Sequence, residues 1–274
     1  MLKNSKERAS DNSTVHLCTD GKARSGCIDP RTGRTELDLT IFDADSACII
    51  ATESLETKQG EKDALKKGLD TNRGRLKGAL LTGDAGMTSI LKDDTIANSG
   101  MDALIQIKRN AGFSYHEAQS LPWEQVITKE TETNQGHGRQ EHRVTRVIDL
   151  GYVENEIQDK YSNVEAIVQI EKWSKNIKSG AVSHSFRYYL GTKMVCELSV
   201  NKVGEIIRDH WKIETFHNTK DVTLGEDRSM IVSSNASRFT ARIRAMVARL
   251  GKVYGSTKKF IESFSQNPHA VAFS

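Results

Sequence analysis

The sequence predicts an α/β fold in which helices flank a mixed β-sheet. Three strand-like runs come first, a helical segment follows, and two further strand-like runs alternate with a second helical segment. Three consecutive strands with short connections favour an antiparallel meander. The later strand–helix–strand segments favour right-handed parallel crossovers, and the two together predict a sheet of mixed direction.

The first three strands are expected close to the N-terminus. Residues 15–20 and 36–42 alternate apolar and polar side chains, as half-buried strands do. Residues 47–52 form a short apolar run that fits a buried strand. Gly21 and Gly26 predict turns between the first two strands, because glycine punctuates regular structure.

The next segment supplies the helices and two more strands. A helix is expected after Gly60, where apolar residues follow at helical spacing and acids occupy the first turn. Residues 78–83 form a fourth strand that ends at Asp84, 87–98 a second helix and 102–107 a fifth strand. This is the element order of the ribonuclease H-like fold, in which the first and fourth strands end side by side.

After the fifth strand the pattern becomes β-rich. Residues 113–190 are interpreted as an insertion into the core, with strand-like runs at 143–150, 164–170 and 182–190. A tight polar turn is expected at 136–139 within this insertion.

Helices are expected towards the C-terminus, at 194–200, 202–219 and 236–252. The apolar face of the last one is predicted from five residues, namely Phe239, Ile243, Met246, Val247 and Leu250. We therefore divide the chain into a disordered or truncated N-terminal tail at 1–13, a catalytic domain at 14–255, and a C-terminal tail at 256–274.

Composition narrows the class of protein. The 274 residues, 37% hydrophobic and 27% charged, are ordinary for a globular protein and can bury a sizeable core. No apolar run approaches the roughly 20 residues needed to span a bilayer, and residues 1–14 lack the apolar stretch of a signal peptide. We expect a cytoplasmic protein without a membrane partner. The four cysteines show no CxxC spacing, which favours reduced thiols without structural zinc.

Three acidic residues form the strongest functional pattern. Asp20 and Asp84 each follow a predicted strand, and Glu214 lies on a predicted helix between His210 and His217. Mg²⁺ prefers oxygen ligands, and two or three carboxylates suffice to hold it. A pair of such ions about 3.5–4 Å apart supports phosphodiester cleavage. We expect Asp20 to bridge two ions and the other two acids to serve one side each, with Mn²⁺ as a substitute for Mg²⁺.

Each acid has an ordinary alternative role. Asp20 could form a turn, Asp84 could cap the following helix, and Glu214 could be a solvated helix residue. A zinc site made of His210, Glu214 and His217 is a minor alternative, because the spacing is not HExxH and no cysteine contributes. The conjunction of fold order and acid placement favours the magnesium interpretation.

Basic residues cluster near the C-terminus. No acidic residue occurs between Asp227 and Glu262, and a segment with that bias suits a phosphate backbone, although a solvated basic helix is the blander alternative. The residues that we expect to contact DNA are Lys22, Arg24, Lys108, Arg139, His210, Trp211, His217, Lys220, Arg228, Arg238, Arg242 and Arg244.

Residues spread over roughly 15–250 resemble those of DDE-class insertion-sequence transposases, in the H-repeat-associated subgroup linked to Rhs elements. The matching segments are Asp20-Gly21-Lys22, Phe42-Asp43-Ala44-Asp45-Ser46, Lys58 with Glu61, Leu81-Thr82-Gly83-Asp84-Ala85, Lys108 with Asn110, His137-Gly138-Arg139 with Glu141 and Arg143, His210-Trp211 with Ile213-Glu214 and His217, Asp221-Val222-Thr223, Glu226-Asp227 with Ser229, Asn235-Ala236, and Arg244.

The resemblance implies a metal-dependent transposase that cuts double-stranded DNA at the element ends and joins the 3′-hydroxyl to target DNA, as a homodimer on DNA. It carries Asp20, Asp84 and Glu214 over as the catalytic trio. The chain departs from the family pattern at Ser89 and Ala111, where relatives have glutamine, and it has only 19 residues before Asp20. Two alternatives therefore stay open: a truncated, inactive DNA-binding remnant, and another ribonuclease H-like nuclease.

Overall fold

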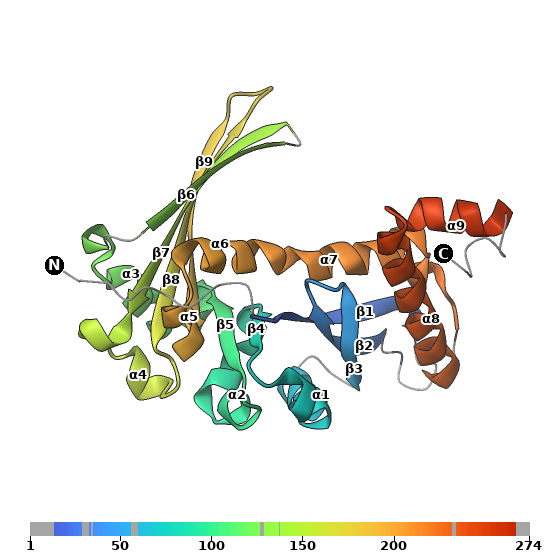
Figure 1. The fold of residues 1–274 in the computed structure, drawn as a ribbon, viewed down its shortest axis with the longest axis horizontal. Helices are drawn as coiled ribbons and strands as arrows, with labels where there is room; N and C mark the ends of the chain where they lie inside the picture. The colour runs from blue at the N-terminus through green and yellow to red at the C-terminus, as the bar shows by residue number, and fades with distance from the viewer. Residues whose placement is uncertain are drawn as a thin grey trace. The chain divides into compact units, whose positions relative to one another are not determined.

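In this computed structural model, the described residues are 14–28, 33, 35–55, 60–126, 129–136, 138–231 and 234–266. The chain divides into two compact units. Unit 1 comprises Met1–Leu17 and Asn72–Asp209, and unit 2 comprises Cys18–Thr71 and His210–Ser274. Each unit contains both strands and helices (Figure 1), so the predicted α/β class with a mixed sheet is confirmed. No helix within the described ranges is long and apolar enough to cross a bilayer.

Unit 2 contains the first three predicted strands. β1 (His16–Ile28) starts at the end of the first segment of unit 1, and β2 (Thr35–Asp43) and β3 (Cys48–Leu55) follow, in the order β3-β2-β1. β2 and β3 are antiparallel, as a meander requires. The predicted turns at Gly21 and Gly26 are wrong, because β1 continues through both glycines. Pairing with a neighbouring strand outweighs the weak strand propensity of glycine there.

Helices and short turns complete unit 2. α1 (Glu61–Leu76) begins in it, and the second segment consists of α7 (Trp211–Asn218), a π-helical turn η7 (Thr219–Thr223), the 3₁₀ turn η8 (Glu226–Arg228), α8 (Ser234–Val253) and α9 (Thr257–Gln266). The segment beyond Gly255 is therefore helical as far as Gln266, and residues 267–274 of the expected tail lie outside the described residues, as does the expected tail at 1–13.

The predicted apolar face of α8 is wrong. Phe239, Ile243, Met246 and Leu250 are exposed, and the buried face of the helix consists of small residues instead. Ala245 and Ala248 pack into a core with Cys18, Phe42, Ala44, Ala47, Ile213 and Phe216. Small side chains let the helix approach this core closely, so the large apolar residues face away from it.

Unit 1 contains the other strands, β4 (Leu80–Gly83), β5 (Asp102–Ile107), β6 (Lys129–Gly136), β7 (Arg139–Asp149), β8 (Ala166–Asn176) and β9 (Val182–Gly191), in the order β4-β5-β9-β8-β7-β6. β4 and β5 are parallel, and the remaining pairs are antiparallel. The helical elements of the unit are η3 (Ala85–Lys92), α2 (Thr95–Asn98), η4 (Arg109–Ala111), α3 (Phe113–Ser120), η5 (Trp123–Gln125), η6 (Leu150–Tyr152), α4 (Ile157–Lys160), α5 (Lys193–Glu197) and α6 (Val200–Asp209).

The β-rich segment between the second and third acids is a run of four long strands, β6 to β9 (Figure 1). Its most regular feature is a row of rings across three of them. Trp173 on β8 lies 4.7 Å from the ring of His184 on β9, nearly parallel to it, and 5.4 Å from the ring of His142 on β7. These residues are register partners, so the row follows directly from strand pairing. His137, in the expected turn, lies outside the described residues.

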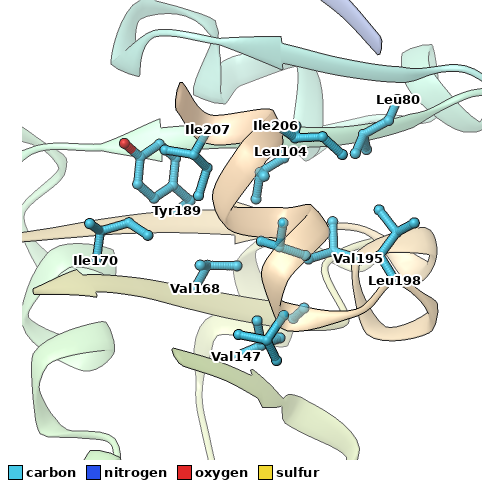
Figure 2. Close-up of a cluster of buried hydrophobic side chains, with 13 residues drawn as sticks. Leu80, Leu104, Val147, Val168, Ile170, Tyr189, Val195, Leu198, Ile206 and Ile207 are labelled. Carbon is cyan, nitrogen blue, oxygen red and sulfur yellow. The ribbon is translucent and has the colours of Figure 1, made fainter. Parts of the chain in front are cut away.

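The core of unit 1 lies between α6 and the sheet. Figure 2 shows Ile206 and Ile207 of α6 directed at side chains that come from the strands, among them Leu104, Val168 and Tyr189. Val203 and Ile206 are almost completely buried. Burial of such a side chain stabilises a fold by about 1.5–3 kcal/mol, so α6 is held in place by its apolar face.

Shortening one side chain of this core should have a modest, measurable effect. We expect Ile206→Val to lower the free energy of unfolding by about 0.5–1.5 kcal/mol, because one buried methyl group is lost. Ile177→Val is the matched control, since Ile177 is 51% exposed and should change stability little. Urea unfolding followed by circular dichroism measures both. Equal losses in the two variants would contradict the placement of Ile206 in the core.

Candidate active site

Asp20 occupies a partly exposed position on β1, where the strand passes beside the C-terminal segment of unit 2. Its carboxylate oxygen Oδ2 lies 3.3 Å from Nδ1 of His217, which is on α7. The His217 side chain is 8% exposed, and its Nε2 atom has no hydrogen-bond partner in the described part of the chain. The contact fixes the position of one expected catalytic acid against the helix that carries another.

An acid to which sequence reasoning gave no catalytic role, Glu61, lies against the strand that carries Asp20. A Cβ atom added to Gly21 would lie 2.5 Å from the Oε1 atom of Glu61, so the carboxylate of Glu61 lies against the backbone at Gly21. Glu61 is in the first turn of α1, where acids are common because they complement the helix dipole. Its contact is with β1 at the residue after Asp20 in the sequence.

Four charged residues form a buried ion network beside this site. Lys22 Nζ contacts the carboxylate of Asp221 and lies 2.5 Å from Oε2 of Glu226. Lys220 Nζ lies 3.1 Å from the same Oε2 atom. Glu226 is 1% exposed, and Lys220 is also buried. The network connects β1, two residues beyond Asp20, with η7 and η8, which follow the helix of Glu214.

The network shifts the pKa values of its members. Burial alone would lower the pKa of Lys22, but its hydrogen bonds to Asp221 and Glu226 and the charges of these acids raise it above 10.5. Burial likewise opposes ionisation of Glu226, yet the two lysines lower its pKa below 4.5. The pKa of Lys220 is lowered, chiefly by burial and additionally by the charge of Lys22. Glu226 is therefore a carboxylate held ionised inside the protein.

The local backbone explains why these side chains meet. α7 ends in the π-helical turn η7, which widens the helix by one residue and occurs often at functional sites. Gly225 follows with a φ of 63°, a left-handed conformation that glycine adopts without strain. The chain then reverses into η8, which brings Glu226 back towards Lys220 and Lys22.

Glu214 lies on the exposed side of α7, three residues before His217. The neighbours of Glu214 on α7 differ in their exposure. Ile213 and Phe216 are buried in the core of unit 2, whereas Trp211 is 50% exposed. The helix face that carries His210, Glu214 and His217 does not continue in regular α-helical spacing to Asp221, because η7 changes the register after Asn218.

Asp84 belongs to unit 1, at the end of β4. Its Oδ1 atom accepts a hydrogen bond of 2.8 Å from the backbone N–H of Gly86, so it caps η3. The ordinary role considered for Asp84 is therefore present. A cap leaves the second carboxylate oxygen available, so capping and metal binding by Asp84 are compatible.

Four residues expected to contact DNA are engaged inside unit 2 instead. Arg24 is buried, with Nε 3.0 Å from Oδ2 of Asp38 and Nη1 donating to Ser237 Oγ at 2.9 Å. Lys22, Lys220 and His217 take part in the contacts described above. The exposed members of the set are Lys108, Arg139, Trp211, Arg228, Arg238 and Arg242, and His210 and Arg244 are half-buried.

The chemistry of the acids fits a hard divalent cation, since Asp20 presents carboxylate oxygens at a partly exposed position. Among the described residues, no three His, Cys, Asp or Glu side chains are already grouped closely enough to hold a metal ion. The convergence of Asp20, Asp84 and Glu214 stays a prediction. The four cysteines, all within the described residues, form no disulfide, and Cys18 and Cys27 lie on the same strand.

The described fold is α/β, with Asp84 directly after β4 and Glu214 on α7 as expected, whereas Asp20 lies inside β1 and not at the predicted strand end, because the strand continues to Ile28. The chain belongs to the transposase DDE domain family, whose model matches residues 39–250. No curated protein matches the chain.

Several solved structures are similar to the chain. A piggyBac transposase, seen in a synaptic complex with hairpin DNA, matches with a TM-score of 0.45 and 11% identity, over 91% of this chain and 51% of that one. The chain thus spans about half of that transposase. Two further structures have lower TM-scores. Streptomyces venezuelae DesVI matches with a TM-score of 0.21 and 12% identity, over 56% of this chain and 71% of that one. An S-adenosylmethionine-dependent methyltransferase from Clostridium acetobutylicum matches with a TM-score of 0.16 and 8% identity, over 54% of this chain and 60% of that one.

Proposed function

We propose that the chain is the catalytic part of a bacterial insertion-sequence transposase with a ribonuclease H-like core, and that Asp20, Asp84 and Glu214 are its catalytic acids. The observation that carries the proposal is the contact between Asp20 and His217. It places the first acid of the trio against α7, the helix of the third acid, in a chain that belongs to the transposase DDE domain family.

Each acid would have a distinct part in holding Mg²⁺ or Mn²⁺. The bound ions would activate the attacking hydroxyl and stabilise the departing oxygen of the phosphodiester. Asp20 would contribute a carboxylate oriented by His217. Asp84 would contribute its Oδ2 atom, because its Oδ1 atom accepts the hydrogen bond that caps η3. Glu214 would approach from the exposed side of α7. His217, whose own side chain is buried, would hold Asp20 in position from one side.

The proposed DNA contacts come from the exposed and half-buried members of the predicted set, apart from Arg238 and Arg242 on α8. Lys108 and Arg139 in unit 1, and His210, Trp211, Arg228 and Arg244 in unit 2, are the candidates. Phosphate contacts by basic side chains make DNA affinity fall steeply with salt. We also propose that two copies of the chain act together on DNA, which sedimentation with and without a duplex would test.

The proposal is tested by strand cleavage and strand transfer on duplexes taken from the DNA that flanks the gene, with Mg²⁺ or Mn²⁺. We expect 3′-hydroxyl ends and joined products from the wild type and neither from Asp84→Asn. The Asn side chain can still accept the cap hydrogen bond from Gly86, so this variant removes a charge without removing the cap.

Three outcomes would contradict the proposal. Equal activity of Asp84→Asn would exclude Asp84 from the site. Salt-sensitive DNA binding without metal-dependent cleavage would identify an inactive binding remnant. Cleavage of an RNA–DNA hybrid without any joined product would indicate a different ribonuclease H-like nuclease.

A further inference from the structure

α8 presents an apolar stripe to solvent. The stripe consists of Phe239, Ile243, Met246, Leu250 and Val253, with exposed fractions between 38% for Leu250 and 79% for Val253. The opposite face of the helix, with Ser237, Ala241, Ala245 and Ala248, is buried. A contiguous patch of large apolar side chains on a protein surface often marks an interaction site, whereas single exposed apolar residues are common and need no explanation.

The residues of the stripe are spaced as in a helix that packs against another helix. Successive members are four, three, four and three residues apart, which is the a/d pattern of a heptad repeat. On a helix this pattern makes a narrow, straight seam that fits the side chains of a second helix. A strand or an irregular loop would not match it. The geometry therefore favours a helical occupant.

The positive charges beside the stripe indicate which kind of helix would bind there. Arg238, Arg242 and Arg249 are exposed and, being four and seven residues apart, they follow one edge of the stripe. The stretch from Arg228 to Ile261 contains no acidic residue that could neutralise them locally. A second copy packed antiparallel on the stripe would bring two arginine rows together. Duplex DNA would satisfy the arginines but leave the apolar side chains in water.

We propose that the α8 stripe binds an amphipathic helix of a partner protein, with apolar residues in its own a and d positions and acidic residues along the flank that faces Arg238, Arg242 and Arg249. The interaction is separate from the catalytic proposal, since none of these residues belongs to the trio. The apolar side chains would supply the affinity, and the arginine row would select an acidic flank and fix the orientation.

The test uses the whole chain and two synthetic helical peptides of roughly three heptads. Both carry Leu and Ile at a and d positions; one has Glu and the other Lys at the flanking positions. We expect the Glu peptide to bind with one-to-one stoichiometry in calorimetry, more weakly as salt rises, and the Lys peptide not to bind. Met246→Ser should weaken binding about tenfold or more, because a central apolar contact is lost.

Two variants sharpen the test. Arg242→Glu should weaken binding of the Glu peptide, because it places a negative charge in the middle of the arginine row. Met230→Ser is the matched control, since Met230 is 86% exposed but lies outside α8, and it should leave binding unchanged. Circular dichroism of each variant checks that the fold is retained.

The proposal would be overturned by any of four results. One is that the Glu peptide does not bind, and another is that it binds Met246→Ser as tightly as the wild type. Concentration-dependent dimerisation that Met246→Ser abolishes would assign the stripe to a second copy of the chain. Loss of duplex DNA binding in Arg242→Glu, with neither peptide bound by the wild type, would assign the arginine row to DNA.

Discussion

Asp20→Asn should lower metal-dependent DNA cleavage by about 10³-fold or more. Asparagine keeps the shape of the side chain but removes the charge that a divalent cation requires. A metal site contributes several kcal/mol to the transition state, and each 1.4 kcal/mol corresponds to a factor of about ten in rate. Single-turnover cleavage of the flanking-DNA duplex measures the loss. Asp45→Asn, at an exposed turn of unit 2, is the control that should retain full activity.

The neighbour of Asp20 should have a smaller and different effect. We expect His217→Asn to reduce activity by about 10- to 100-fold, as removal of a residue that orients a metal ligand does. Because the His217 side chain contacts Asp20 at 3.3 Å, its loss should also raise the Mg²⁺ concentration needed for half-maximal cleavage. An unchanged metal requirement would show that His217 only supports the fold.

The second large effect concerns stability. Glu226→Gln should lower the free energy of unfolding by about 3–5 kcal/mol, because it leaves the buried ammonium group of Lys220 without its carboxylate partner and removes one of the two carboxylates that contact Lys22. Urea unfolding near neutral pH measures the change. Glu262→Gln provides the control, since Glu262 is exposed on α9 and should contribute almost nothing. A loss in Glu226→Gln no larger than in the control would contradict the buried network.

The same group predicts the response to acid. The pKa of Glu226 is lower in the folded protein than its ordinary 4.5, so its stabilising contribution is present above that pH and is lost as the pH falls below it. The raised pKa of Lys22 acts in the opposite direction, and its contribution is lost as the pH rises beyond 10.5. Unfolding midpoints between pH 3 and 7 should therefore fall more in the wild type than in Glu226→Gln.

Local periodicity predicted much of the fold. Alternating or apolar runs identified β2, β3, β4 and β5 because each strand buries a regular subset of its side chains. β6 was missed, since its sequence, KETETNQG, contains no large apolar residue and its pairing with β7 is decided by the neighbouring strand. The division of the helix at His210 and the register change at η7 likewise depend on contacts that a single sequence does not display.

For the candidate site, the sequence pointed to individual residues but not to the contacts that the fold makes between them. Residue type and placement singled out Asp20 and His217 but not the contact between them, and the catalytic role of Asp20 stays a prediction. Lys22 and Lys220 were interpreted as DNA ligands because charge in a sequence favours exposure, whereas their acidic partners are brought close only by the fold. For α8, large apolar residues predicted the buried face, although the small residues are the ones that pack.

The discontinuity of unit 2 has a consequence for the order in which the protein matures on the ribosome. Asp20 is synthesised early, while its contact His217 belongs to a segment that follows the whole of Asn72–Asp209. At 5–20 residues per second, roughly 10–40 s pass between the two. During that interval the second segment of unit 1 is synthesised, so unit 1 has its complete sequence before α7 and α8 become available to the first three strands. A nascent chain that ends before His217 therefore cannot form the Asp20–His217 contact, so assembly of the acidic site is delayed until the segment that follows Asp209 has been synthesised.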